Sequence, residues 1–293
     1  MEAKNLITVL GWEERFIAGF DKILDSEELD SIILIIFNDY AGMSKMDIHK
    51  TDVEDKAKKK NIPLETIELN YNNSIDNWKT LNTFFKEREI TDVLANLTTI
   101  PRETIWALLF FLKKNNTEVK YIYFKPIEYS KGWLTKNHKE PRLLFKHSGI
   151  FDLDKELLLI VLTGFDETRL IQLVEYYEPQ KLIILNQDGS EFENSKRNKS
   201  LINLNTELVT EVQKIDSYLV DDTTKVLDSC IENNSKYNII LASQGPKTSS
   251  LSSYNAYLNS NKKIGLSYVP ARDFSPSYST GINEKEISGN LFF

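Results

Sequence analysis

The chain has 293 residues, of which 41% are hydrophobic and 27% charged, and its formal net charge at pH 7 is −7. A chain of this length buries either one large core or two of medium size. The negative net charge argues against a protein that coats duplex nucleic acid with a broad basic surface, but it is compatible with a small anionic ligand in a local basic pocket.

Cysteine and histidine are scarce, which limits the chemistry that the chain can support. There is one cysteine, Cys230, and there are three histidines without metal-ligand spacing, so we expect no disulfide framework and no metal site. The sequence identifies no cofactor. The N-terminal residues lack the apolar core of a signal peptide, and no apolar run reaches the roughly eighteen residues of a membrane helix. We therefore expect a cytoplasmic protein that does not bind a membrane.

Apolar runs and helical spacings alternate along the first half. Residues 32–37 (IILIIF) are apolar throughout, as is typical of a central parallel strand that is covered on both faces. Period and composition predict strands at residues 6–10, 32–37, 64–69, 92–97 and 119–124. Helices are predicted at residues 13–24, 52–60, 75–86 and 101–114, with a loop at 39–50.

The second half repeats this alternation. Strands are predicted at residues 157–163, 181–185, 200–205, 237–242 and 264–269, helices at 167–177, 218–233 and 247–258, and a polar loop at 187–200. Strands separated by helices of this length pair in parallel through right-handed crossovers. The predicted fold class is therefore α/β, with two tandem Rossmann-like units, each a mainly parallel sheet with helices on both faces.

An internal duplication relates the two halves. Residues 93–130 align without a gap on residues 238–275, so that Pro101 falls on Pro246, and a base follows the proline in both copies. At the front of each half, an apolar strand is followed by a glycine, an aromatic residue, an acidic pair and an arginine. The predicted domains are residues 1–130 and 157–275, with an ordered connector at 131–156 and a tail at 276–293 that either covers a pocket or frays.

Ligands of such sheets bind outside the carboxyl ends of the strands, which directs attention to the loops after the first and fourth strands. A helix N-terminus with hydroxyl residues before it and a base in its first turn suits a phosphate. The alternative is ordinary helix capping and initiation. The predicted ligand-binding residues are Arg15, Thr98, Thr99, Arg102, Arg169, Ser243, Gln244 and Lys247.

Four acidic residues at the same strand ends are candidates for catalysis: Glu13, Glu14, Asp166 and Glu167. They either stabilise helix starts and pair with nearby bases, or act as a general base or as ligands for a divalent ion near a phosphate. Likewise, Arg15 and Arg169 either contact a ligand or form salt bridges. The sequence patterns of P-loop NTPases, dinucleotide-binding sites and α/β-hydrolases are absent.

This arrangement resembles the CARF-type sensor domains of prokaryotic antiviral systems, which pair about a two-fold axis and bind cyclic oligonucleotides between their strand ends. Residues 11–15 with 98–102, and residues 164–169 with 243–247, stand where the loops of that family would be. The resemblance implies a fused pair of such domains over residues 1–275. The chain departs from most members in having no recognisable effector nuclease domain, which implies a stand-alone sensor or a ligand-degrading variant.

The first hypothesis is therefore a nucleotide-binding sensor or regulatory subunit of a prokaryotic antiviral defence system, which leaves room for a separate effector protein. Its ligand would be a cyclic oligonucleotide or another small anionic nucleotide, with Arg102 and Lys247 holding phosphates. One alternative is an enzyme that hydrolyses or transfers a nucleotide or sugar phosphate. The other is a non-catalytic scaffold.

Overall fold

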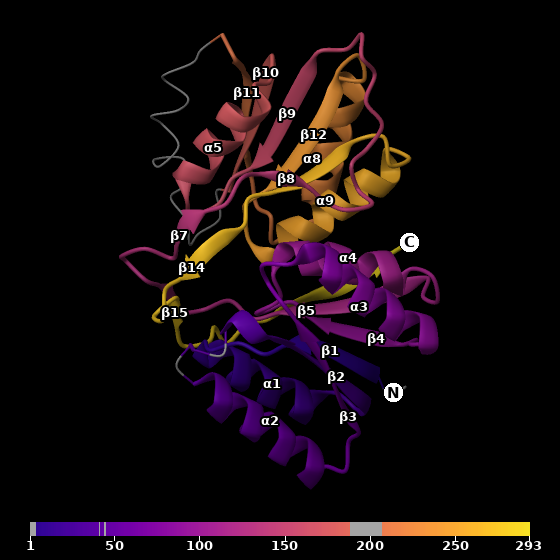
Figure 1. The fold of residues 1–293 in the computed structure, drawn as a ribbon, viewed down its shortest axis with the longest axis vertical. Helices are drawn as coiled ribbons and strands as arrows, with labels where there is room; N and C mark the ends of the chain where they lie inside the picture. The colour runs from indigo at the N-terminus through magenta and orange to yellow at the C-terminus, as the bar shows by residue number, and fades with distance from the viewer. Residues whose placement is uncertain (1–3, 41, 44, 188–206) are drawn as a thin grey trace. The chain divides into compact units, whose positions relative to one another are not determined.

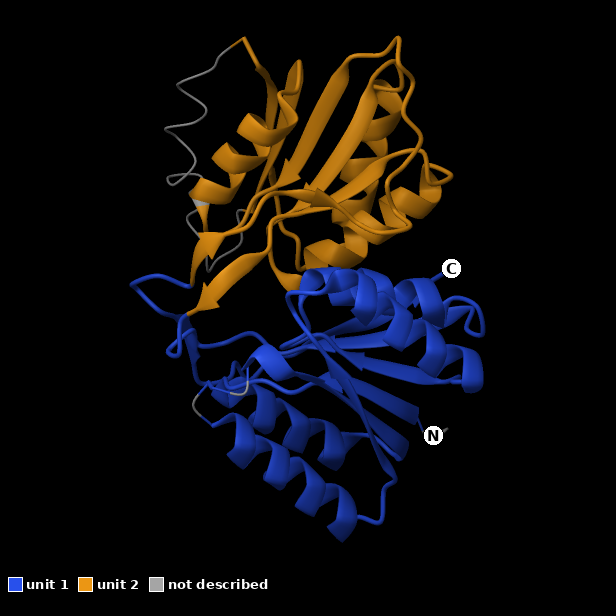
Figure 2. Ribbon diagram, in the orientation of Figure 1, with its two compact units in different colours: residues 1–134, 275–293 blue, residues 135–274 orange. Residues whose placement is uncertain are grey.

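A computed structural model of the protein describes residues 4–40, 42–43, 45–187 and 207–293 (Figure 1). The chain forms two compact units, of which unit 1 contains Met1–Leu134 and Ser275–Phe293 and unit 2 contains Thr135–Phe274 (Figure 2). Both units are Rossmann-like, so the predicted α/β fold class with two tandem units is confirmed.

Unit 1 is a six-stranded sheet in the order β16-β5-β4-β1-β2-β3. Its strands are β1 (Lys4–Val9), β2 (Leu29–Phe37), β3 (Leu64–Leu69), β4 (Val93–Asn96), β5 (Glu118–Tyr123) and β16 (Ile287–Phe292). Strands β1 to β5 run parallel, whereas β16 is antiparallel to β5. Helices α1 and α2 lie on one face of this sheet and α3 and α4 on the other (Figure 1). These are α1 (Glu14–Ser26), α2 (Met46–Lys59), α3 (Ser74–Glu87) and α4 (Arg102–Leu112).

Unit 2 repeats this topology with the order β11-β10-β9-β12-β13-β8. Its strands are β9 (Leu157–Leu162), β10 (Lys181–Gln187), β11 (Val209–Ile215), β12 (Asn238–Ser243), β13 (Gly265–Tyr268) and β8 (Arg142–Leu143), the last antiparallel to β13. Its described helices are α5 (Glu167–Tyr177), α8 (Val220–Asn233) and α9 (Lys247–Asn259). Reading β9 to β13 as counterparts of β1, β2, β3, β4 and β5 makes the two parallel orders identical.

The sixth strand of each sheet lies outside the predicted Rossmann-like unit to which that sheet belongs. Strand β8 of unit 2 lies in the predicted connector, directly after unit 1, and β16 of unit 1 lies in the predicted tail, after unit 2. There are also two short antiparallel ribbons. Strand β6 (Glu128–Tyr129) pairs with β15 (Ser279–Thr280) in unit 1, and β7 (Thr135–His138) pairs with β14 (Ala271–Phe274) in unit 2. The unit boundaries therefore differ from the predicted ones, because the connector and tail belong to the sheets.

The strand registers also correct the alignment of the two halves. A gapless alignment places Ile122 on Ser267. In unit 1, Ile122 pairs with Asn96, but the residue of unit 2 that pairs with Leu241, the counterpart of Asn96, is Leu266. The last parallel strand is thus displaced by one residue between the copies.

Two elements differ from their predicted extents. Helix α2 begins at Met46, inside the predicted loop 39–50, because Met46, His49, Val53 and Ala57 form one buried helical face. Strand β11 was not predicted, because it is an edge strand whose more buried positions include polar residues. The strand predicted at 200–205, and residues 188–200 of the predicted loop, lie outside the described residues. No helix of the described part is long and apolar enough to cross a membrane.

Candidate functional site

In each unit, the loops after the first and fourth strands touch at the carboxyl end of the sheet. A Cβ atom on Gly11 would lie 2.5 Å from Thr99 Cγ2, and Thr99 donates a hydrogen bond to the Val9 carbonyl. In unit 2, a Cβ atom on Gly164 would lie 1.8 Å from the carbonyl oxygen of Gln244. The two loops therefore meet at the strand ends, the edge at which such folds usually take a ligand.

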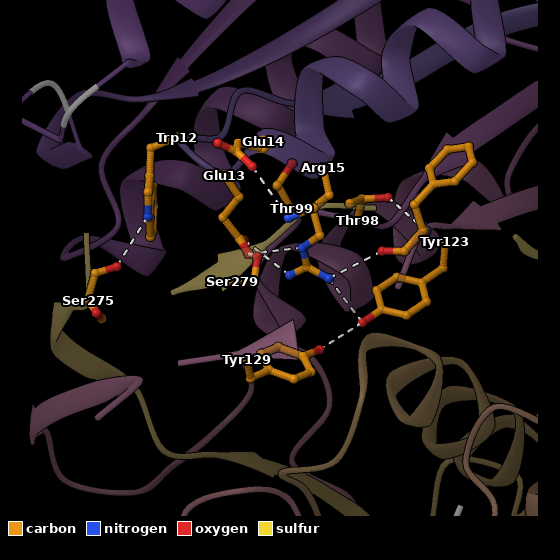
Figure 3. A network of polar contacts seen from close by, with 12 residues as sticks. Trp12, Glu13, Glu14, Arg15, Thr98, Thr99, Tyr123, Tyr129, Ser275 and Ser279 are labelled. Atoms are coloured by element: carbon orange, nitrogen blue, oxygen red, sulfur yellow. Dashed lines mark hydrogen bonds and ion pairs between the residues drawn. The ribbon is translucent and has the colours of Figure 1, made fainter. Parts of the chain in front are cut away.

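Arg15 and Glu13 form a buried ion pair in unit 1 (Figure 3). Arg15 Nε and Nη2 lie 2.9 Å and 3.1 Å from the two carboxylate oxygens of Glu13, and Nη1 donates to Tyr123 Oη and to the Phe124 carbonyl at 3.2 Å and 3.3 Å. The two side chains are 2% and 8% exposed. Burial acts to lower the pKa of Arg15, but the adjacent charge of Glu13 raises it well above its usual value.

Glu14, although adjacent to Glu13, serves a different contact. Its exposed carboxylate pairs with Lys45 at 3.1 Å and accepts a hydrogen bond from the Gly281 amide at 3.4 Å. The hydrogen bond from Lys45 lowers the pKa of Glu14. Ser279 donates to Glu13 instead, so each carboxylate has its own partners.

The predicted hydroxyl residues of unit 1 join strand ends. Thr98 Oγ1 donates to Asn96 Oδ1 at 2.7 Å and accepts from the Phe124 amide at 3.1 Å. Helix α4 begins at Arg102 after Pro101 and has no side-chain cap. The hydroxyl groups of Thr98 and Thr99 therefore hold the loop in place, and neither caps the helix.

Asp166 is the centre of a polar cluster in unit 2. It caps α5 by accepting from the Thr168 amide at 3.1 Å, and its Oδ2 lies 3.0 Å from His138 Nε2 and 3.2 Å from Thr135 Oγ1. Burial acts to raise the pKa of Asp166, but hydrogen bonds from His138 and Thr168 and the charge of Arg169 hold it well below the usual range.

Arg169 joins this cluster to the loop after the fourth strand of the unit. Its Nη1 donates to Gln244 Oε1 at 3.3 Å and its Nη2 to Thr135 Oγ1 at 3.0 Å. The structure thus brings together three predicted residues, Asp166, Arg169 and Gln244. It adds Thr135 and His138, which the sequence analysis missed because only the pairing of β7 with β14 places them beside α5.

Of the remaining predicted residues of unit 2, Ser243 ends β12, whereas Lys247 and Glu167 begin helices. The Oγ atom of Ser243 lies 2.7 Å from the Oγ atom of Ser249, which is the third residue of α9. Lys247 is the first residue of α9, which has no side-chain cap and no acidic residue in its first turn. Glu167 begins α5, and its side chain lies outside the described part of the structure. Within that part, no group of three or more acidic, histidine or cysteine side chains is placed to hold a metal ion.

Comparisons with known proteins bear on the fold. No family model matches the chain, and no curated protein matches it in sequence. A solved structure described as a type III CRISPR defence DNA nuclease activated by cyclic oligoadenylate is similar to it, with a TM-score of 0.58 and 9% identity. The likeness covers 96% of this chain and 68% of that one. At this identity it concerns the fold alone.

Proposed function

We propose that the protein is a nucleotide-binding sensor of a prokaryotic antiviral defence system, and that its ligand is a small anionic nucleotide of the cyclic oligoadenylate kind. The ligand would lie on the carboxyl ends of the sheets, with Arg102 and Lys247 contacting phosphates. The fold likeness to a nuclease that is activated by cyclic oligoadenylate supports this proposal. We propose that a separate effector protein responds to the bound ligand.

The matched starts of α4 and α9 are the observation that carries the proposal. Both helices follow a proline, begin with a base and lack a side-chain cap. Their first backbone N–H groups have no intrahelical acceptors, and together with the helix dipole they favour an anion. A base in the first turn adds a full positive charge. Each unit therefore offers one helix start that suits a phosphate group.

The contacts of the acidic residues favour binding over catalysis. Glu13 is held by Arg15, Glu14 by Lys45, and Asp166 by His138 and Thr168. Their partners lower the pKa of Glu14 and of Asp166, so these two carboxylates are weaker bases. These residues are therefore better suited to fixing the loops than to accepting a proton from a substrate.

A binding screen tests the proposal. Thermal unfolding and calorimetric titration would be measured with cyclic oligoadenylates of different ring size, linear oligoadenylates and mononucleotides. We expect saturable binding of a cyclic oligonucleotide by the native protein and its loss in the Arg102→Ala, Lys247→Ala double variant. Absence of binding across the panel, or unchanged binding by a correctly folded double variant, would contradict the proposal.

A further inference from the structure

We propose that unit 2 holds a phosphate of the ligand through direct polar contacts from Arg169 Nε and Thr248 Oγ1, whereas the Arg15–Glu13 pair of unit 1 is a fixed structural element. This inference rests on the proposed nucleotide-binding function. Three differences between the duplicated units carry it.

The first difference lies in how the two arginines are satisfied. All three guanidinium nitrogens of Arg15 donate hydrogen bonds, two of them to the carboxylate of Glu13. Arg169 donates through Nη1 and Nη2 to neutral acceptors only, and its Nε, 3.9 Å from Asp166 Oδ2, has no hydrogen-bond partner. Asp166 is already engaged by His138 and Thr168. Arg169 therefore keeps one guanidinium donor, Nε, for a ligand.

The second difference lies at the helix starts. The residue after the leading base is Glu103 in α4 but Thr248 in α9. A carboxylate in the first turn stabilises the helix by itself and repels another anion. The start of α9 has no acidic residue in that turn and offers a hydroxyl donor instead. The better phosphate position is therefore in unit 2.

The third difference is a set of buried polar atoms in unit 2 without a hydrogen-bond partner. They include Arg169 Nε, Thr248 Oγ1 and Ser217 Oγ, on residues that are 6%, 0% and 0% exposed. Buried polar atoms are nearly always paired, and an exception calls for an explanation such as a bound group. Because helical side chains tilt toward the N-terminus, the hydroxyl of Thr248 faces the start of α9, where the phosphate would lie. Because Thr248 is fully buried, a contact with the ligand requires the start of α9 to move.

The chemistry of these donors indicates the part of the ligand that unit 2 recognises. A guanidinium group presents a planar set of donors that matches phosphate oxygens, and a threonine hydroxyl adds a short neutral donor. We infer that unit 2 contacts a phosphodiester group. On this account, a single phosphodiester dominates the affinity, although the fold is duplicated.

Titration of three variants with the cyclic oligoadenylate that the native protein binds tests this inference. Arg169→Lys keeps the charge but loses the planar donor set, and we expect it to weaken binding roughly tenfold or more. Thr248→Val should weaken binding about three- to tenfold, the loss of one neutral hydrogen bond. The same variant should unfold at an unchanged or higher temperature, because it removes a buried hydroxyl without a partner. If the hydroxyl had only a structural role, Thr248→Val would leave binding unchanged and would lower the unfolding temperature.

Glu103→Thr is the matched control, since it gives α4 the residue that α9 carries. We expect it to bind at least as tightly as the native protein. Native-like binding by Arg169→Lys and Thr248→Val, or a loss in Glu103→Thr as large as that in Thr248→Val, would overturn the inference. Absence of binding by the native protein would instead count against the proposed function, so the two failures are distinguishable.

Discussion

The guanidinium group of Arg15 meets the carboxylate of Glu13 through two hydrogen bonds, of 2.9 Å and 3.1 Å, in a position where both side chains are buried. Tyr123 and Tyr129 complete the surroundings, with each ring centroid 5.8 Å from the Arg15 guanidinium carbon. The contacts tie the start of α1 to the end of β5. The ion pair therefore joins three parts of unit 1, namely its first helix, its last parallel strand and the adjoining ribbon.

Breaking this pair should destabilise unit 1. Removing one partner of a buried ion pair leaves the other uncompensated, so we expect Arg15→Met to lower the free energy of unfolding by about 3–5 kcal/mol. The Arg15→Met, Glu13→Gln double variant should cost less than the sum of the single changes. All four tryptophans lie in unit 1, so denaturant unfolding followed by tryptophan fluorescence reports on this unit. Additive costs would contradict the expected coupling.

The cluster around Asp166 should make unit 2 sensitive to acid. The pKa of Asp166 is depressed below its ordinary value of 3.8, so its contribution to stability is complete above the pKa of the unfolded chain and is lost as the pH falls through the folded value. We expect Asp166→Asn to cost about 1–3 kcal/mol at neutral pH and to flatten the dependence of stability on pH below about pH 4. Chemical unfolding across this range, followed by circular dichroism, would measure it. An equal cost at every pH would exclude the ionised carboxylate as the cause.

Gly164 should resist substitution. An added Cβ would lie 1.8 Å from the Gln244 carbonyl, so Gly164→Ala has to displace the loop that leads into α9. We expect a loss of about 1–3 kcal/mol in stability, together with weaker nucleotide binding. Gly42→Ala is the control, since its Cβ would meet no atom within 4 Å. Equal melting temperatures for the two variants would show that the loops are not in close contact.

Strand β16, which follows unit 2 in the sequence and pairs with β5, should be required for the stability of unit 1. Leu291 is 1% exposed and pairs with Val119 of β5, so Leu291→Asp would bury a charge and detach the strand. We expect a loss of about 3 kcal/mol or more, measured by tryptophan fluorescence. Asn290→Asp places the same carboxylate at the neighbouring, exposed position and should have little effect. If both variants unfolded alike, β16 would not be part of the native sheet.

The sequence predicted elements whose signal is local. Residues 32–37 and 157–162 are apolar throughout because they form strands that are covered on both faces, and the structure has β2 and β9 there. The duplication likewise located the starts of α4 and α9 at equivalent positions. These features depend on neighbours in the chain and can therefore be read from periodicity.

The edge strands β8 and β16, and the contact of His138 with Asp166, could not be predicted in this way. Strand β16 is recognisable only beside β5, and the contact between His138 and Asp166 exists only because β7 pairs with β14. Pairings between distant segments leave no periodic pattern in the sequence. Arg15 is a different case, because the sequence left a ligand contact and a salt bridge open as alternatives, and the structure pairs it with Glu13, two positions away.

Hydrogen exchange with and without a cyclic oligoadenylate is the most direct measurement of where a nucleotide binds. The first amides of a helix lack intrahelical acceptors, so a phosphate at these positions should slow their exchange. We predict protection at the starts of α4 and α9 and in the loops after β1 and β9, with the larger effect at the start of α9. Unchanged exchange at the strand ends, or protection confined to the opposite edge of the sheets, would contradict the proposed sensor function.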